Sequence, residues 1–175
     1  MAQPTEQAIR ELLDRQEILD CIHRYCRGID RHDAELLASA YHPDAIDDHG
    51  IIKAPVAEFI TWAFEGHRKN QHGHQHYVTN HSCELDGDTA HTETYFIMLG
   101  QNKNGTPLTL HGGRYVDRFE RRDGRWAIAY RASLLEWVGG LGDPDLPPVQ
   151  RVQPGPITRD RTDLSYRRPL EPTVD

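Results

Sequence analysis

The spacing of apolar residues changes once along the chain, and this change limits the folds open to it. In the first half, apolar residues recur every three or four positions, the period of a helix with one buried face. From Thr5 to about Asp30 the recurring residues are Ile9, Leu12, Leu13, Ile18, Ile22, Tyr25 and Ile29. This pattern predicts a long helix capped by Thr5. Similar spacing predicts helices over 33–41, before Pro43, and over 56–69.

The second half reads as long strands joined by tight turns. Extended segments are predicted at roughly 75–85, 89–101, 108–121 and 125–137. Turn sequences rich in Asp, Asn and Gly separate them, and the Gly112-Gly113 pair is a natural point for a strand to bend. Helices followed by an antiparallel meander predict an α+β domain, with the helices packed on one face of a curved sheet.

Beyond Trp137 the composition changes. Prolines stand at positions 144, 147, 148, 154, 156, 169 and 172, which excludes a regular sheet or a long helix. We therefore expect one domain over 1–137 and a proline-rich extension over 138–175. The extension would cover the pocket mouth or a neighbouring subunit, anchored by Ile157, Leu164 and Tyr166, or form a mobile end.

Composition and charge exclude several classes of partner. The chain has 175 residues, enough for one domain with a sizeable core, and a formal net charge of −7. A nucleic-acid partner is not expected, because the one basic cluster, at 120–125, is interleaved with acids. No apolar run approaches the length of a membrane span, and the N-terminus does not resemble a signal peptide. Three cysteines without a CxxC pair indicate no disulfide framework, so we expect a cytoplasmic protein.

Histidines are the most conspicuous polar residues. His72, His74 and His76 alternate, and on a strand this spacing would allow a metal site. No acidic or cysteine partner is placed by a motif, so we expect His72 and His74 to be solvated and no metal or cofactor to bind. His76 begins a strand pattern with Val78, Asn80 and Ser82 on the same face. A histidine beside small polar residues suits a wet pocket and is a catalytic candidate.

Two charged residues leave alternatives open. Asp30 follows the apolar stripe of the first helix, either as a helix-terminal acid or as a carboxylate that orients an imidazole and stabilises its protonated form. Tyr25 lies five residues earlier, about 140° away around an ideal helix, so both reach one pocket only if the pocket is wide or the helix is distorted. Arg131 shares a predicted strand face with Ala127, Ala129 and Ser133. If buried, it pairs either with a protein acid or with a substrate anion.

Three segments resemble a known family. Residues 24–30 (RYCRGID), 76–80 (HYVTN) and 113–126 (GRYVDRFERRDGRW) are similar to SnoaL-like domains of the nuclear transport factor 2-like superfamily. Similar enzymes include bile-acid 7α-dehydratase, hexachlorocyclohexane dehydrochlorinase and, more distantly, scytalone dehydratase. The resemblance spans about Thr5 to Trp137. It implies a cone-shaped α+β barrel, with helices on a strongly curved, mostly antiparallel sheet that encloses a pocket.

The resemblance also implies a chemistry. In the dehydratase and dehydrochlorinase relatives an Asp–His dyad removes a proton without a cofactor or metal, and Asp30 and His76 match that dyad. Arg131 matches the strand arginine that assists the leaving group, and Tyr25 matches the tyrosine of the bile-acid dehydratase. Apart from these matches, we expect Asn80, His111, Tyr115 and His49 to contact substrate. His49 and His111 are extra histidines beside the family pattern, and His111, on one predicted strand face with Tyr115 and Asp117, is either a second acid or base or a core residue.

The expected activity is a cofactor-independent, dehydratase-type lyase acting on a hydrophobic, hydroxylated aromatic or polycyclic molecule. The alternatives are an aldehyde-releasing carbon–carbon lyase, an isomerase with the same dyad, and a non-catalytic small-molecule binding protein. We also expect a homo-oligomer, a dimer or a trimer, because relatives of this kind often form one.

Overall fold

The computed structural model describes residues 4–104, 108–140, 154–156 and 161–172. The chain begins with a long helix, α1 (Glu6–Arg31), capped as predicted by the Thr5 side chain, which accepts a hydrogen bond from the backbone N–H of Ala8. Only the second half of α1 is buried, from Ile18 onward, whereas Ile9, Leu12 and Leu13 are exposed. Only the C-terminal half of the predicted apolar stripe therefore packs in the core. Within the described ranges no helix is long and apolar enough to cross a membrane.

The segment after α1 differs most from the prediction. The helix expected over 33–41 is a single short turn, α2 (Ala34–Ala38), and two unpredicted strands follow it, β1 (Tyr41–Asp48) and β2 (Lys53–Pro55). Pairing in parallel with a distant strand holds β1 in place. Gly28 lets α2 pack closely on α1, because a Cβ there would lie 2.6 Å from the backbone nitrogen of Leu37. The third helix, α3 (Val56–Asn70), matches its prediction.

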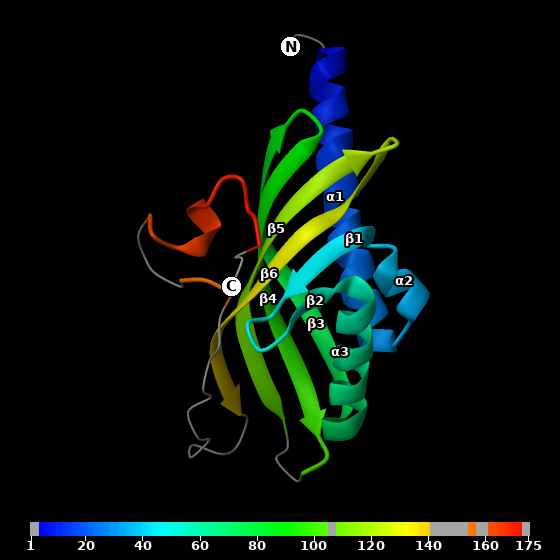
Figure 1. Ribbon diagram of the computed structural model, residues 1–175, viewed down its shortest axis with the longest axis vertical. Helices are drawn as coiled ribbons and strands as arrows, with labels where there is room; N and C mark the ends of the chain where they lie inside the picture. The colour runs from blue at the N-terminus through cyan, green and yellow to red at the C-terminus, as the bar shows by residue number, and fades with distance from the viewer. Residues whose placement is uncertain (1–3, 105–107, 141–153, 157–160, 173–175) are drawn as a thin grey trace.

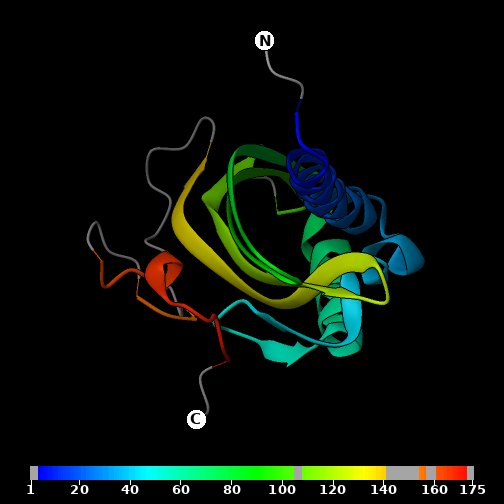
Figure 2. The same cartoon turned by 90° about the horizontal axis from the view of Figure 1, so that it is seen from above.

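Four long strands complete the domain: β3 (Gln71–Asp86), β4 (Thr89–Asn102), β5 (Thr109–Arg122) and β6 (Arg125–Gly140). The sheet order is β2-β1-β6-β5-β4-β3, and every pair is antiparallel except β1–β6. Figure 1 shows the elements from the side, and Figure 2 shows the sheet curling around the space that α1 and α3 cover. The α+β class and the curvature are as expected, but the barrel is not closed, because β2 and β3 remain separate edges.

Bulges set which side chains face the concave side of the sheet. In β3, Val78 pairs with Phe96 and His81 with Thr94, so Thr79 and Asn80 together oppose Tyr95 alone. The extra residue reverses the alternation and leaves Asn80 exposed. The prediction that Asn80 shares a pocket face with His76 is therefore wrong.

Two further bulges lie in β6. The residue skipped by the pairing register at the first bulge is Ala129, so Trp126 and Ile128 join the main core while Tyr130 packs on the opposite face. The predicted alternation of 127, 129, 131 and 133 on one face therefore fails before Arg131. The second bulge lies opposite Gly112-Gly113, where the bend was expected. A Cβ on Gly113 would lie 1.9 Å from the carbonyl oxygen of Leu134.

The described part of the proline-rich extension packs on the convex face of the sheet. Leu164 and Leu170 are buried there in a second apolar cluster with residues of β5 and β6. Asp163 accepts two hydrogen bonds from Arg114 of β5, both at 3.0 Å. Figure 2 shows this segment outside the curl of the sheet, so it lies away from the concave side. Tyr166 is exposed, and Ile157 lies outside the described residues.

A buried histidine in β1 makes fold stability depend on pH. The His42 side chain is buried, and its Nε2–H donates to the carbonyl oxygen of Glu120 at 2.9 Å. Burial, together with the guanidinium groups of Arg122 and Arg125, lowers the pKa of His42 to about 4. The unfolded chain takes up this proton below about pH 6.5 and the folded chain does not, so stability falls as the pH drops from about 6.5 toward 4.

We predict that His42→Gln, which retains a donor for Glu120, reduces this loss. Between about pH 7.5 and about pH 5, wild type should lose up to about 2 kcal/mol more free energy of unfolding than the variant. Urea denaturation at the two pH values measures the difference. Equal losses in the two proteins would show that His42 is not held neutral in the fold.

Candidate active site

The end of α1 and the first half of β3 bring an aspartate and a histidine together. Asp30 Oδ1 lies 2.6 Å from His76 Nδ1, and Asp30 Oδ2 accepts the backbone N–H of His76 at 2.9 Å. The two side chains are 12% and 8% exposed, so little water competes for the contact. The carboxylate holds the proton of the imidazole on Nδ1 and leaves the Nε2 lone pair free to act as a base. The predicted contact between Asp30 and His76 is therefore present in the structure.

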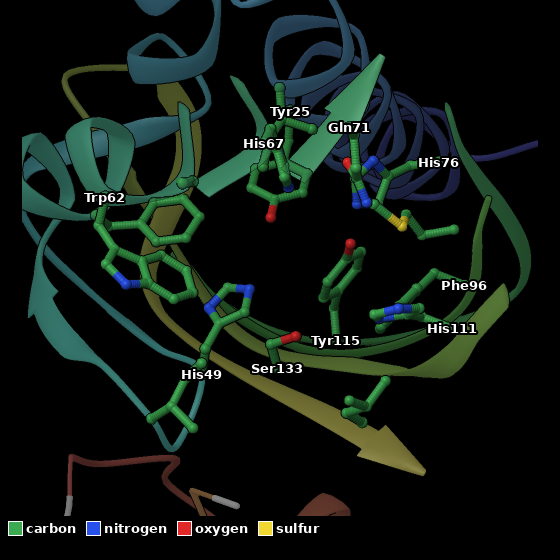
Figure 3. Close-up of a pocket in the computed structure, with 16 residues that line it drawn as sticks. Tyr25, His49, Trp62, His67, Gln71, His76, Phe96, His111, Tyr115 and Ser133 are labelled. Carbon is green, nitrogen blue, oxygen red and sulfur yellow. The ribbon is translucent and has the colours of Figure 1, made fainter. Parts of the chain in front are cut away.

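His76 lines a cavity of about 350 Å³ between the two long helices and the concave face of the sheet. Figure 3 shows the lining side chains converging on this space. Its walls are mainly apolar and aromatic, with a few polar groups among them, as is usual for a small-molecule pocket. His49, His111 and Tyr115, which the sequence predicted as substrate contacts, all line the cavity, and Asn80 does not.

Arg131 does not line the cavity but lies behind its tyrosines. Its Nε and Nη2 donate to the two oxygens of Asp117 at 2.7 and 2.8 Å, and both side chains are completely buried. Its guanidinium carbon lies 4.1 Å from the ring centroid of Tyr25 and 4.0 Å from that of Tyr115. The sequence left open whether Arg131 pairs with a protein acid or with a substrate anion, and in the structure it pairs with a protein acid, Asp117. Burial alone would lower the pKa of Arg131, but the Asp117 carboxylate outweighs it, and the guanidinium stays charged.

Tyr25 and Tyr115 both line the pocket (Figure 3), and the hydroxyl oxygen of Tyr25 is buried. Tyr25 comes from the last turns of α1, so it and Asp30 reach the same cavity despite the angle between them on the helix. The rings of Tyr25 and Tyr115 meet edge to face at 5.4 Å, and Phe96 stacks on Tyr115 at 4.4 Å. Burial raises the pKa of both tyrosines well above the ordinary value, so they are neutral hydrogen-bond donors.

A second Asp–His pair, which the sequence did not reveal, faces the same cavity. His49 Nδ1 lies 2.5 Å from Asp47 Oδ1, and the other oxygen of Asp47 accepts the hydroxyl of Tyr41 at 2.5 Å. Asp47 is completely buried. Figure 3 shows His49 and His76 on different sides of the pocket. The signal was an aspartate and a histidine two positions apart, which point the same way only once residues 41–48 are known to form a strand.

More histidines gather beside the first dyad than the sequence indicated. His74 was expected to be solvated, but its side chain is only 3% exposed and its Nε2–H donates to the carbonyl oxygen of Ile29 at 3.1 Å. His67 of α3 lines the cavity, and its ring centroid lies 3.9 Å from that of His74. Burial and the neighbouring His74 and His76 lower the pKa of His67 to about 3. Of the two histidines that were expected to be solvated, His72 is exposed and His74 is not.

Comparison with known proteins agrees with this architecture. The sequence profile of the SnoaL-like domain matches residues 10–132, more than half of the chain, and the chain belongs to this family. The resemblance noted in the sequence is therefore confirmed. No curated protein matches the chain.

Among solved structures, a hexachlorocyclohexane dehydrochlorinase (LinA) of type 2 is similar, with 24% identity and a TM-score of 0.72 over 80% of this chain and 97% of that one. A putative scytalone dehydratase from Novosphingobium aromaticivorans has 17% identity and a TM-score of 0.68, covering 82% and 97%. A putative aromatic ring hydroxylase from the same species has 26% identity and a TM-score of 0.65, covering 74% and 94%. The similarity establishes the fold, and two of these proteins carry the names of elimination enzymes.

The buried Arg131–Asp117 pair generates a stability prediction. Asp117→Asn keeps the shape of the side chain but leaves the guanidinium unpaired in the core, at an expected cost of about 3–5 kcal/mol. Asp88→Asn is the matched control, because Asp88 pairs with Arg121 at the surface, at 2.6 Å, where such a pair contributes about 0–1 kcal/mol. Urea denaturation measures both. Similar small losses for the two variants would contradict a structural role for the buried pair.

Proposed function

We propose that the chain is a cofactor-independent lyase that eliminates a small leaving group from a hydrophobic, hydroxylated aromatic or polycyclic molecule. The Asp30–His76 dyad at an apolar pocket carries this proposal. Catalysis by proton abstraction requires a base with a free lone pair, a group that stabilises the base once it is protonated, and little competing water. The dyad offers all three.

The reaction begins when His76 Nε2 removes a proton from an acidic carbon of the substrate. The electrons of the broken C–H bond form a new double bond, and the leaving group departs from the adjacent carbon with its bonding electrons. The imidazolium that forms is stabilised by Asp30, which already holds Nδ1–H at 2.6 Å. No electrons are lost or gained overall, so the elimination needs no redox partner. A positioned base of this kind contributes about 10²–10⁴-fold to the rate.

A departing hydroxyl group needs a proton donor. His49, held by Asp47, and the neutral side chains of Tyr25 and Tyr115 all line the cavity. In this step His49 starts as the imidazolium, with Nδ1–H held by Asp47, and gives the proton on Nε2 to the leaving group, which leaves the imidazole neutral. Arg131 assists indirectly, since its charge lies against the rings of the two tyrosines and favours negative charge developing at their hydroxyl groups.

The pocket favours a compact aromatic substrate. Its volume of about 350 Å³ lies near the lower end of the range of about 300–1,000 Å³ for ligand sites. Phe59, Trp62 and Phe96 supply flat apolar surface, while His111 and Ser133 add polar contacts that fix an orientation. A ring system bearing one or two hydroxyl or carbonyl groups matches this lining.

We predict that wild type, incubated with a chelator and without an added cofactor, produces a new conjugated chromophore from at least one compound of a suitable panel. The panel comprises hydroxylated steroids, β-hydroxy carbonyl compounds and hydroxylated diaryl compounds, followed by ultraviolet difference spectra. His76→Gln and Asp30→Asn should each lower kcat by about 10²–10⁴-fold. His72→Gln is the control, because His72 is exposed on the same strand.

The outcomes separate the competing functions. A rate in His76→Gln equal to that of wild type would show that the dyad is not the base. A product of unchanged mass with a moved double bond would indicate an isomerase, in which a proton removed at one dyad returns elsewhere. Binding of panel compounds without any product would identify a small-molecule binding protein.

A further inference from the structure

Three histidines from three different elements meet next to the pocket. His32 is the C-cap of α1, His67 lies in the last turn of α3, and His74 lies in β3. One nitrogen from each ring lies within 4.8 Å of the chosen nitrogens of the other two. The ring centroids of His32 are 6.0 Å from His67 and 5.5 Å from His74. His32 is distant in sequence from His67 and His74, which belong to the consecutive elements α3 and β3, so the cluster is complete only in the folded chain.

The hydrogen bonding of this cluster is incomplete. His32 Nε2 and His67 Nδ1 are buried and have no hydrogen-bond partner among the residues that the structure describes. Buried ring nitrogens nearly always find a partner, so two unpartnered ones in a single cluster call for an explanation. His74 is different, because its Nε2–H donates to the carbonyl oxygen of Ile29 and fixes the ring. Metal-binding imidazoles are usually oriented in this way, with one ring N–H donating to a backbone carbonyl and the other nitrogen left for the metal.

The surroundings favour a cation. His32 and His67 stand at the carboxyl ends of α1 and α3, where the helix dipoles place partial negative charge. The carboxylate of Asp30 lies 3.7 Å from His74 Nε2. Arg68 is the opposing charge, since it acts electrostatically on His32 and lies over the ring of Phe64. His32 also adopts a left-handed backbone, φ 53°, which is uncommon for a residue other than glycine and directs it toward the cluster.

A second possible ligand set overlaps the first and must be weighed against it. Asp30, His74 and His76 also place ligand atoms within 4.8 Å of one another. Asp30 and His76, however, already satisfy each other through two hydrogen bonds. His32 Nε2 and His67 Nδ1, in contrast, have no hydrogen-bond partner among the described residues that a metal ion would have to displace. Of the two sets, the three histidines are therefore the better prepared to take an ion.

We propose that His32, His67 and His74 bind one divalent transition-metal ion of the zinc class, separately from the Asp30–His76 dyad. Imidazole is a preferred ligand of Zn²⁺, Co²⁺ and Ni²⁺. Nitrogens about 2.0–2.1 Å from a tetrahedral ion lie roughly 3.3 Å apart, so the rings close around it by small rotations. Because His67 lines the pocket, the fourth position of the ion opens toward the cavity, where water or a ligand oxygen can occupy it.

The test is a titration of metal-free, tag-free protein with Co²⁺ alone, followed by visible absorption, and with Zn²⁺ by calorimetry. We expect one ion per chain and the strong visible bands of a tetrahedral Co²⁺ site. His67→Gln, His74→Gln and His32→Asn should each weaken binding by more than about 100-fold, since even the loss of an outer-shell partner costs about 10–100-fold. Asparagine is chosen at position 32 because it tolerates the left-handed backbone.

Two controls make the result decisive. His72→Gln removes an exposed histidine two residues from His74 and should bind as wild type does, while circular dichroism and urea midpoints confirm that each variant is folded. His76→Gln and Asp30→Asn should also retain the ion. Loss of binding in these two variants with retention in His32→Asn would assign the ion to the overlapping set and overturn the proposal. Absence of stoichiometric binding in folded wild type would overturn it as well.

Discussion

The buried ion pair between Arg131 and Asp117 is the contact on which the pocket depends. It joins β5 to β6 at the back of the cavity, and the guanidinium lies against Tyr25 of α1 and Tyr115 of β5. A charge with no access to water stabilises a fold only when its partner and its surroundings are correctly placed. The requirement is met only when the first helix, the strands and the two tyrosines are all in position. The orientation of the pocket wall is thus linked to the integrity of the core.

Curvature of the sheet does the rest of the positioning. Bulges in β3 and β6 bend the strands and change which side chains face inward. Because of them Ser133 points into the cavity while Asn80 does not. The tail then covers part of the convex face through Leu164, Leu170 and Asp163, so that side of the sheet also has an apolar cluster. The two faces of β5 and β6 therefore serve different purposes, with the pocket on one and the tail on the other.

The cavity has an unusual concentration of imidazoles. His76 and His49 are each held by an aspartate, whereas His67 and His111 line the same space and contact no aspartate among the residues that the structure describes. Burial lowers the pKa of His67 and of His111, so both are neutral near pH 7. The aspartates thus divide these histidines into two groups, one in contact with a carboxylate and one surrounded mainly by apolar and imidazole groups.

Much of the fold and part of the candidate site could be predicted from the sequence. The features that could not be predicted were missed for one physical reason. Local periodicity identified α1, α3 and the four long strands, and the family resemblance assigned the Asp30–His76 dyad. Local pattern failed for β1, whose apolar spacing is irregular around Pro43 and which is held by parallel pairing with β6, more than 80 residues away. Asp47 and the orientation of His49 were missed for the same reason. Asn80 was misplaced because a bulge is a property of strand pairing and leaves no trace in a two-residue alternation.

The sequence by itself determined the two long helices, the four long strands, the order in which they occur and the chemical types available to the pocket. Tertiary structure alone decided that Arg131 pairs with Asp117, that a second dyad faces the first, and that His32, His67 and His74 converge. Periodicity reports which side of an element is buried, because burial repeats along one chain segment. Which charged or polar groups meet depends on pairing register and helix placement between distant segments, and no local pattern encodes that.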